Sequence, residues 1–237
     1  MATPKYPMKA GDYLQYSANN EDVKGTTGND KIKAGSGNDR VWGNSGNDVI
    51  YGEAGNDKLY GELGNDIVYG GDGADYILAQ YGSDKLYGGN GNDNITVIAG
   101  GDHVAYGEAG NDLIWSRTST AGNRTYYGGS GADEFNISTT TWGDLGGKHG
   151  NNPLGTVYLP DFNPREGDIL SLVHSHDTKW GMGSTDFRGN TLYLSGFNGS
   201  HHGLYGTIVF SNGVTEADLA RHTLIDFEDH LGSHTYF

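Results

Sequence analysis

The sequence predicts an all-β protein in which short strands stack along one axis as a solenoid, and three observations lead to this expectation. A nine-residue phrase, G-x-x-G-N-D-x-U-x with U a large apolar residue, recurs about twelve times between Gly25 and Asn136. Only 35% of the chain is hydrophobic while Gly contributes 41 residues, so a conventional core would be hard to fill. One apolar residue per copy cannot bury itself, so the copies must stack to build a continuous core.

The first nine copies follow one another without insertion or deletion. An additional residue, Tyr106, then precedes the copy at Gly107, and Ser116 to Thr118 precede a worn copy at Ser119, before the last copy at Gly128. The nine uninterrupted copies start at Gly25, Ala34, Gly43, Gly52, Gly61, Gly70, Ala79, Gly88 and Val97.

Positions seven to nine of each copy are expected to form a three-residue strand, because alternation points the middle residue inward and its neighbours outward. Positions one to six then form the turn, where glycine permits a positive φ and close backbone approach. The inward residues of the twelve copies are Ile32, Val41, Ile50, Leu59, Val68, Ile77, Leu86, Ile95, Val104, Ile114, Tyr126 and Phe135. A flexible Gly/Asn/Asp-rich linker is the alternative, but a linker has no reason to keep an apolar residue at every eighth position.

The sixth position of each copy carries the candidate metal ligand, and it is aspartate in every copy except the one with Arg124. Such a turn leaves carbonyl oxygens unpaired beside a carboxylate at a fixed offset. Hard cations such as Ca²⁺ take about six to eight oxygen ligands, which two adjacent turns can provide together. The candidate aspartates are Asp30, Asp39, Asp48, Asp57, Asp66, Asp75, Asp84, Asp93, Asp102, Asp112 and Asp133.

Charge supports a bound cation. The formal net charge of the chain is −15, and residues 25–136 contain 16 acidic against 7 basic side chains. So much charge and glycine favours disorder unless something external supplies stability. We therefore expect the repeat segment to be largely unfolded at low calcium and to fold when Ca²⁺ neutralises the aspartates. The same acidic balance, without basic patches, argues against nucleic-acid binding.

These repeats resemble the RTX (repeats-in-toxin) nonapeptide calcium-binding family. The resemblance implies a right-handed parallel β-roll with two copies per coil and a C-terminal β cap. Turns 18 residues apart would then lie side by side, with Asp30, Asp48, Asp66, Asp84 and Asp102 along one edge and the other candidate aspartates along the opposite edge. It also implies that one turn offers the carbonyls of positions two and four, and its neighbour those of positions one and three.

The resemblance sets the expected number of ions and their backbone ligands. Five neighbouring pairs on each edge give an upper limit of ten sites, from which Arg124 and the lost glycines at Ala79 and Val97 subtract, leaving roughly seven to nine Ca²⁺ ions. The implied carbonyl ligands are Gly35, Ser36, Gly37, Gly43, Asn44, Ser45, Gly46, Gly52, Glu53, Ala54, Gly55, Gly61, Glu62, Leu63, Gly64, Gly70, Gly71, Asp72, Gly73, Gly88, Gly89, Asn90 and Gly91.

Aromatic residues recur at the outward-facing ninth position, where Tyr51, Tyr69 and Tyr87 are expected to form a ladder on one face. Exposed aromatics on a flat sheet could face a ligand by stacking on sugar rings, or meet another protein. The alternative is that stacked tyrosines stabilise neighbouring strands, and we favour that interpretation.

Beyond Asn136 the repeat ends, which divides the chain into an N-terminal cap (1–24), the calcium-binding roll (25–136) and a C-terminal capping and secretion-signal region (137–237). The stretches 128–137 and 161–172 resemble those that close the roll in serralysin-type proteases, secreted lipases and the R-modules of mannuronan C5-epimerases. Short runs at 191–195 and 207–211, followed by Asn212-Gly213, predict strands and a turn. The acidic residues before a hydrophobic terminus at 224–237 are similar to type I secretion signals.

Other metal sites and catalysis have weaker support. His174, His176, His201 and His202 invite a zinc or iron hypothesis, but no third ligand stands at a diagnostic spacing. The chain has no Cys and matches neither H-E-x-x-H nor G-x-S-x-G, and only about 24 residues precede the roll, so we do not expect an enzyme unless the chain is a fragment. No stretch approaches the length of a membrane span, and the N-terminus lacks the apolar region of a signal peptide.

Three functions fit these observations. The first is a secreted calcium-binding protein, exported by type I secretion machinery and acting at the cell surface or in an extracellular matrix. The second is a calcium-dependent module that binds extracellular polysaccharide, and the third is the export and folding domain of a larger secreted hydrolase.

Overall fold

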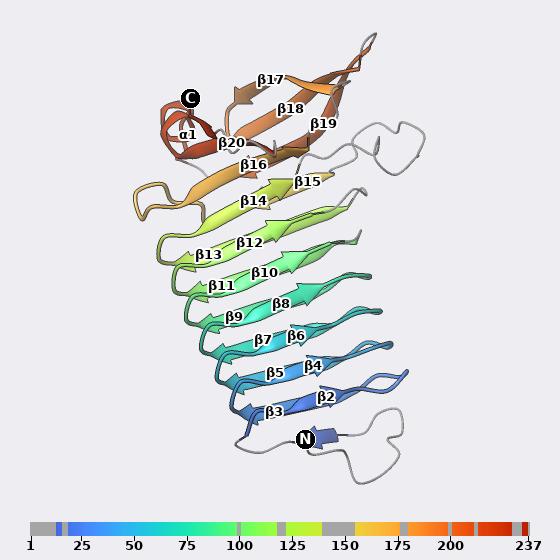
Figure 1. Cartoon of the computed structure of the whole chain (residues 1–237). Coiled ribbons are helices and arrows are strands. Elements are labelled where there is room, and N and C mark those ends of the chain that lie inside the picture. Colours follow the sequence, from blue (N-terminus) through green and yellow to red (C-terminus); the bar gives the residue numbers. More distant parts are fainter. Residues whose placement is uncertain are drawn as a thin grey trace.

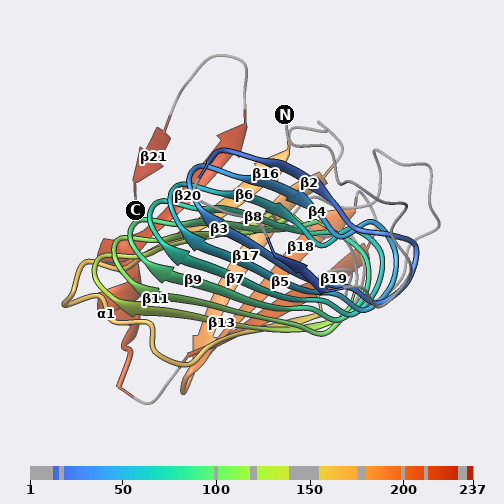
Figure 2. The same cartoon turned by 90° about the horizontal axis from the view of Figure 1, so that it is seen from below.

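The computed structural model describes residues 13–15, 19–98, 101–117, 122–138, 155–175, 180–198, 201–210, 213–228 and 234–236, and in it the repeats form a parallel β-solenoid (Figure 1). Each coil contributes one strand to each of two sheets that face one another, as the view along the stack shows (Figure 2). The expected parallel β-roll followed by a C-terminal β region is therefore confirmed.

Strands alternate between the sheets along the chain. The first sheet contains, in spatial order, β1 (Tyr13–Gln15), β3 (Lys31–Ser36), β5 (Val49–Ala54), β7 (Ile67–Asp72), β9 (Lys85–Asn90), β11 (His103–Ala109), β13 (Asn123–Ser130), β15 (Thr156–Leu159), β19 (His201–Phe210), β18 (Thr191–Asn198) and β17 (Trp180–Arg188). The second contains β2 (Asp22–Lys24), β4 (Arg40–Trp42), β6 (Lys58–Tyr60), β8 (Tyr76–Ala79), β10 (Asn94–Val97), β12 (Leu113–Ser116), β14 (Glu134–Ser138), β16 (Ile169–Ser175), β20 (Thr223–Glu228) and β21 (His234–Tyr236).

The core lies between the two sheets and is built from the eighth position of each copy. Ile32, Ile50 and Val68 stand directly above one another in the first sheet, at a constant offset of 18 residues, and all three are completely buried. The first position also points inward, so Ala34, Ala79 and Val97 join this core. Because each rung buries little by itself, the stack is stabilised by contacts between neighbouring coils.

The register of the copy at Val97 differs from the expectation. Leu86 pairs with Ala105, and Tyr87 with Tyr106, so Ala105 is the buried residue of this rung and Val104 lies outside it. The additional residue therefore falls between Val97 and His103, in the turn before β11, and not at Tyr106. A turn can absorb an inserted residue, whereas an insertion within a strand would reverse the faces of all later side chains.

The stack also begins earlier than Gly25. Val23 in β2 is buried and pairs with Val41, and Glu21 takes the sixth position of a degenerate preceding copy. Beyond the last repeat, β15 and β16 continue the two sheets in parallel before the chain turns antiparallel through β19, β18 and β17. The proposed boundaries at 24/25 and 136/137 thus fall within the stack of strands.

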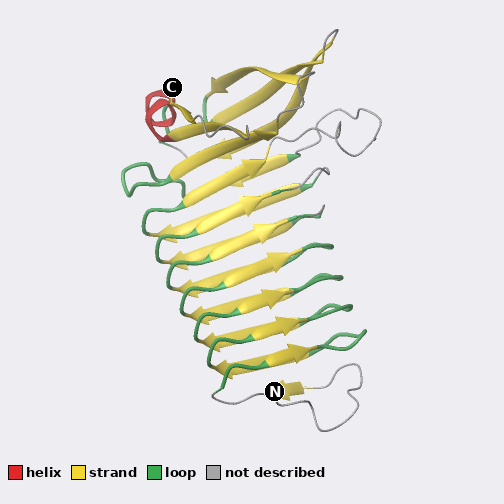
Figure 3. Cartoon of the chain, viewed as in Figure 1, coloured by secondary structure: helices red, strands yellow, loops and turns green. Residues whose placement is uncertain are grey.

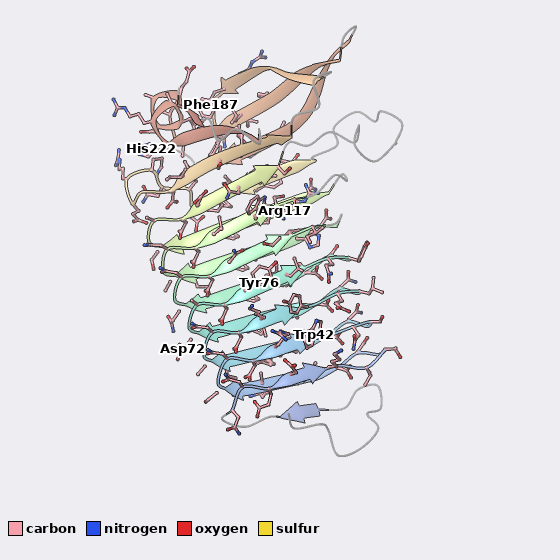
Figure 4. The ribbon with its side chains drawn as sticks, in the orientation of Figure 1. Trp42, Asp72, Tyr76, Arg117, Phe187 and His222 are labelled. Atoms are coloured by element: carbon pink, nitrogen blue, oxygen red, sulfur yellow. The ribbon has the colours of Figure 1, made fainter. Side chains whose placement is uncertain are left out.

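The last coil is covered by a C-terminal cap with an aromatic cluster of its own. Phe135 of the roll meets Phe162 at a ring-centroid distance of 5.9 Å, and Phe162 meets Phe210 at 5.3 Å. Phe187, labelled in Figure 4, meets Phe210 at 6.2 Å. Helix α1 (Glu216–His222), red in Figure 3, adds the buried Leu219 to this region. The sequence interpretation did not include this helix, although Thr215 with Asp218 forms a capping box at its start.

Among the described residues, no helix is long and apolar enough to cross a membrane.

Candidate metal sites at the two edges

The turns of the solenoid form two edges, coloured green in Figure 3. We call the turns that lead into the first sheet the first edge, and those that lead into the second sheet the second edge. The first edge carries Asp30, Asp48, Asp66 and Asp84, and the second edge carries Asp39, Asp57, Asp75, Asp93, Asp112 and Asp133. All ten side chains are at most 3% exposed.

Neighbouring aspartates on an edge are connected by a regular hydrogen bond. Except at Asp84, the backbone N–H of each of these aspartates donates to Oδ1 of the aspartate in the next coil, as from Asp57 to Asp75 at 2.7 Å and from Asp48 to Asp66 at 2.9 Å. Three such links lie on the first edge and six on the second, where the last runs from Asp133 to Asp168 at 3.1 Å. Each link fixes one carboxylate oxygen and aims the other into the turn.

The second oxygen, Oδ2, is buried without a hydrogen-bond partner in most of these aspartates. Such an atom costs about 1–3 kcal/mol or more when nothing compensates it, and a buried carboxylate requires a cation or a proton. The atoms concerned are Oδ2 of Asp39, Asp48, Asp57, Asp66, Asp75, Asp84, Asp93, Asp112 and Asp133.

First-position glycines leave the space into which these oxygens project. A Cβ on Gly43 would stand only 2.5 Å from Oδ2 of Asp48 and 2.7 Å from the carbonyl oxygen of Gly61 in the next coil. At Gly43 no side chain fits without displacing these atoms, so glycine lets the two oxygens converge here. The same pairing of an aspartate oxygen with the carbonyl of the next coil recurs at Gly25, Gly52, Gly70, Gly88 and Gly107.

A second row of carbonyl oxygens runs through the fourth position of the turns. Gly64 has a φ of +135°, and the carbonyl oxygen of Gly46 in the preceding coil lies against its Cα, where a Cβ would collide. Carbonyls of positions two and three, such as those of Asn44 and Leu63, accept hydrogen bonds between coils, and a carbonyl oxygen has a second lone pair. The turns are therefore lined by oxygen, as a hard cation such as Ca²⁺ requires.

The asparagine of the repeat has a structural role that the sequence interpretation did not assign. The side-chain carbonyl of Asn38 accepts the backbone N–H of Asn56 at 2.8 Å, and that of Asn47 accepts the N–H of Asn65 at 2.8 Å. These fifth-position ladders run parallel to the aspartate rows on the solvent side. Their regularity is readable from the recurring Asn-Asp pair, since asparagine tolerates turns and bonds backbone groups.

In the metal-free stack, burial raises the pKa of Asp39, Asp48, Asp57, Asp66, Asp75, Asp93, Asp112 and Asp133. The pKa rises to about 6 for Asp57 and Asp75 and to about 7 for Asp66 and Asp93, with desolvation as the largest cause. The hydrogen bond from the preceding backbone N–H lowers the pKa, and the charge of neighbouring aspartates raises it again. Without a cation the rows are thus electrostatically unfavourable at neutral pH.

Each row has a defined end. Oδ2 of Asp30 accepts hydrogen bonds from the backbone N–H and the hydroxyl of Thr26, at 2.5 and 2.9 Å. At the C-terminal end of the second edge, Oδ2 of Asp168 accepts the N–H of Asn163 at 2.8 Å. The sequence interpretation missed Asp168 as a member of the row, although Gly167-Asp168-Ile-Leu repeats the Asp-x-U signal of positions six to eight.

The structure does not place Asp102 in the first-edge row. Because of the shifted register, His103 takes the sixth position, and its Nδ1 lies 3.3 Å from the N–H of Asp84 and 3.2 Å from Oδ2 of Asp84. Asp102 is exposed and instead accepts the N–H of Asn123 at 2.8 Å, as a fifth-position asparagine would. Arg124 pairs with His103 across β11 and β13 and is completely buried.

Side chains alone do not form a compact metal centre in the described ranges, where no group of three or more His, Cys, Asp or Glu is suited to hold an ion. An ion at either edge would therefore take most of its ligands from backbone carbonyls. The side chains of His174, His176, His201 and His202, the subjects of the zinc or iron hypothesis, lie outside the described residues, as do most side chains of the expected secretion signal.

Tyrosines form a continuous ladder on the outer face of the first sheet. Five rings, of Tyr51, Tyr69, Tyr87, Tyr106 and Tyr127, stack at centroid distances of 4.7–4.9 Å with interplanar angles of 5–11°. The second sheet carries Trp42, Tyr60 and Tyr76 on its outer face, where Trp42 and Tyr60 stack at 5.7 Å (Figure 4). Since the faces of the ladder rings cover one another, the ladder presents ring edges and hydroxyls to solvent.

A parallel solenoid with oxygen-lined turns and buried, unpartnered carboxylates at a fixed spacing defines a calcium-binding β-roll. A family model for the RTX calcium-binding nonapeptide repeat matches the chain in four copies, at residues 17–50, 35–68, 42–77 and 69–104. Residues 17–104 therefore match the calcium-binding nonapeptide repeat of the RTX family, in agreement with the resemblance found in the sequence.

Two further comparisons are less informative. No match was found among curated proteins. Among solved structures, the solution structure of the AlgE6R3 subunit from the Azotobacter vinelandii mannuronan C5-epimerase is similar at 18% identity, with 92% of this chain and 86% of that chain covered and a TM-score of 0.29.

Proposed function

We propose that this protein is secreted, that its β-roll folds when it binds Ca²⁺, and that it acts at the cell surface or in an extracellular matrix without catalysing a reaction. The observation that carries the proposal is the pair of buried aspartate rows, whose Oδ2 atoms have no hydrogen-bond partner. Cations placed between successive turns would neutralise these oxygens and complete the carbonyl rows.

The location follows from the energetics of the metal-free state. In low-calcium cytoplasm the aspartate rows would repel one another, and the chain would remain unfolded and suited to export through type I secretion machinery. Millimolar extracellular calcium would then drive folding, since each site filled at about 100 times its Kd stabilises the folded state by about 2.7 kcal/mol.

Nine hydrogen bonds join the backbone N–H of one aspartate to Oδ1 of the aspartate in the next coil, and each marks a candidate ion position. This upper limit of nine ions lies within the seven to nine expected from the sequence. Side-chain ligands would come from Asp30, Asp48, Asp66 and Asp84 on the first edge, and from Asp39, Asp57, Asp75, Asp93, Asp112, Asp133 and Asp168 on the second.

Circular dichroism of the full chain in excess EGTA, followed by titration with Ca²⁺, tests the proposal. The β signal should appear with Ca²⁺ and be much weaker with equimolar Mg²⁺, which demands octahedral geometry and keeps its waters. A β signal that EGTA leaves unchanged would refute calcium-driven folding.

Binding of extracellular polysaccharide is a second candidate function, and the tyrosine ladder gives it little support. Sugar rings would need free aromatic faces, whereas the ladder faces are stacked on one another, and the ammonium groups of Lys31 and Lys33 lie 5.6 and 5.4 Å from the ring centroid of Tyr51. We therefore propose that the ladder primarily stabilises the sheet. A glycan array with uronate polymers, with and without Ca²⁺, tests this, because calcium-dependent retention would support the polysaccharide function.

The third possibility, an export and folding domain of a larger hydrolase, is decided by the length of the native gene product.

A further inference from the structure

We infer that the two edges hold different numbers of ions, because on the first edge the side chains of His103 and Arg124 take the place of Ca²⁺ beyond Asp84. This inference rests on the proposed calcium function and concerns how the sites are distributed. It assigns the last first-edge ion to the Asp66–Asp84 pair, while the second edge continues in the same coils to Asp133 and Asp168.

The sixth-position residues of the first edge change beyond Asp84. After Asp84, the next two residues on this edge are His103 and Arg124, which stand side by side in β11 and β13 and are both completely buried. His103 brings no negative charge, and the guanidinium of Arg124 is permanently positive in proteins. A divalent cation between these two turns would meet the fixed positive charge of Arg124 and no sixth-position carboxylate.

His103 also contacts Asp84. Nδ1 of His103 lies 3.2 Å from Oδ2 of Asp84, the carboxylate oxygen that would face an ion. Nδ1 of His103 also lies 3.3 Å from the backbone nitrogen of Asp84. In the other turns, the carboxylate of the next coil accepts the hydrogen bond from the equivalent backbone N–H. The ring therefore occupies the side of Asp84 on which a second ion would be placed.

The first position of the copies also differs on this edge. Here two successive copies, at Ala79 and Val97, replace glycine, and both side chains are buried, with 1% and 0% exposure. At the equivalent Gly43 a Cβ would stand 2.5 Å from Oδ2 of Asp48, so these side chains crowd the turns; on the second edge Ala34 makes the same replacement in a single copy.

The second edge of the same coils shows none of these changes. Gly88 and Gly107 keep the open first position, and Asp93 and Asp112 keep the unpartnered Oδ2. The departures are thus confined to one side of coils that are otherwise intact. Three first-edge and six second-edge sites follow, so the C-terminal coils would be held by metal on one side and by the side chains of His103 and Arg124 on the other.

Counting ions in two variants of the first edge tests this inference. Asp48 is linked to aspartates on both sides, whereas Asp84 is linked to Asp66 on one side and to His103 on the other. Both D48N and D84N keep an oxygen to accept the N–H of the preceding coil, which makes them a matched pair. Native mass spectrometry at saturating Ca²⁺ should show a loss of two ions for D48N and of one for D84N, relative to the unchanged chain.

Any other loss for D84N, and in particular a loss of two ions, would overturn the inference. If neither variant loses an ion, the proposed calcium function itself fails. Should D48N not fold, an anomalous difference map of the unmutated protein crystallised with Ca²⁺ decides the question. We expect a peak between Asp66 and Asp84 and none between Asp84 and His103, and a peak at the second place would contradict the inference.

Discussion

Replacing Asp75 by asparagine should have effects of opposite sign with and without calcium. Asp75 is 2% exposed, accepts the N–H of Asp57 through Oδ1 at 2.7 Å, and donates its own N–H to Asp93 at 2.8 Å. It therefore belongs to two neighbouring ion positions on the second edge. In D75N, the amide oxygen can still accept the Asp57 N–H, but the charge shared by both positions is lost.

With saturating Ca²⁺, two weakened sites should lower the free energy of unfolding by about 5 kcal/mol, taking about 2.7 kcal/mol per site filled at about 100 times its Kd. Without metal, the change should go the other way. Burial raises the pKa of Asp75 from 3.8 to about 6, so ionising it in the metal-free fold costs about 3 kcal/mol at pH 7 or above. Asparagine avoids most of that cost.

Urea unfolding monitored by circular dichroism measures the first effect, and the β signal in EGTA measures the second. Asp72 provides a matched control, because it stands in the same turn but is exposed, and D72N should change stability by less than about 0.5 kcal/mol in either condition. The reasoning would be refuted if D75N and D72N unfolded alike in Ca²⁺, or if D75N lost structure in EGTA relative to the unmutated chain.

Three other predictions follow from the same geometry. In G70A, a Cβ would collide with Oδ2 of Asp75 and the carbonyl of Gly88, so the free energy of unfolding in Ca²⁺ should fall by about 1–3 kcal/mol, and an unchanged urea midpoint would contradict this. Without metal, the pKa values of Asp57, Asp66 and Asp93 are about 6 to 7 in the fold, against an ordinary value of 3.8, so the fold binds more protons than the unfolded chain between about pH 4 and 7. The β content of the metal-free protein should therefore increase as pH falls through this window, and a pH-independent signal would count against the reasoning. Y87A removes two stacked pairs, at 4.8 and 4.9 Å, and should cost about 1–3 kcal/mol in thermal or urea unfolding while leaving the number of bound ions unchanged; a lost ion would show that the ladder is coupled to the metal sites.

The repeat made most of the fold predictable. An apolar residue at every eighth position specifies which side chain of each strand is buried, and Ile32, Ile50 and Val68 stack as this pattern requires. The stacking of Tyr51, Tyr69 and Tyr87 follows from the same periodicity. Strict spacing leaves one register in which every core position is filled, so sequence and structure agree over these copies.

Where the spacing changes, sequence reasoning lost the register. The insertion near His103 was assigned to Tyr106, because Asp102 continued the aspartate column in the sequence. In the structure, the pairing of Tyr106 with Tyr87 and the burial of Ala105 show that the inserted residue lies before His103. These are contacts between coils, which no local sequence pattern specifies. Asp168 was missed for a related reason, since 35 residues separate it from Asp133, its neighbour in the row.

The most direct test of the central claim is the number of Ca²⁺ ions bound per folded chain, measured by native mass spectrometry or by titration calorimetry at saturation. The nine links between neighbouring aspartates predict about nine ions whose binding coincides with the gain of β structure. Binding of two ions or fewer, or a full β signal before any ion is bound, would contradict the account of the aspartate rows as calcium sites.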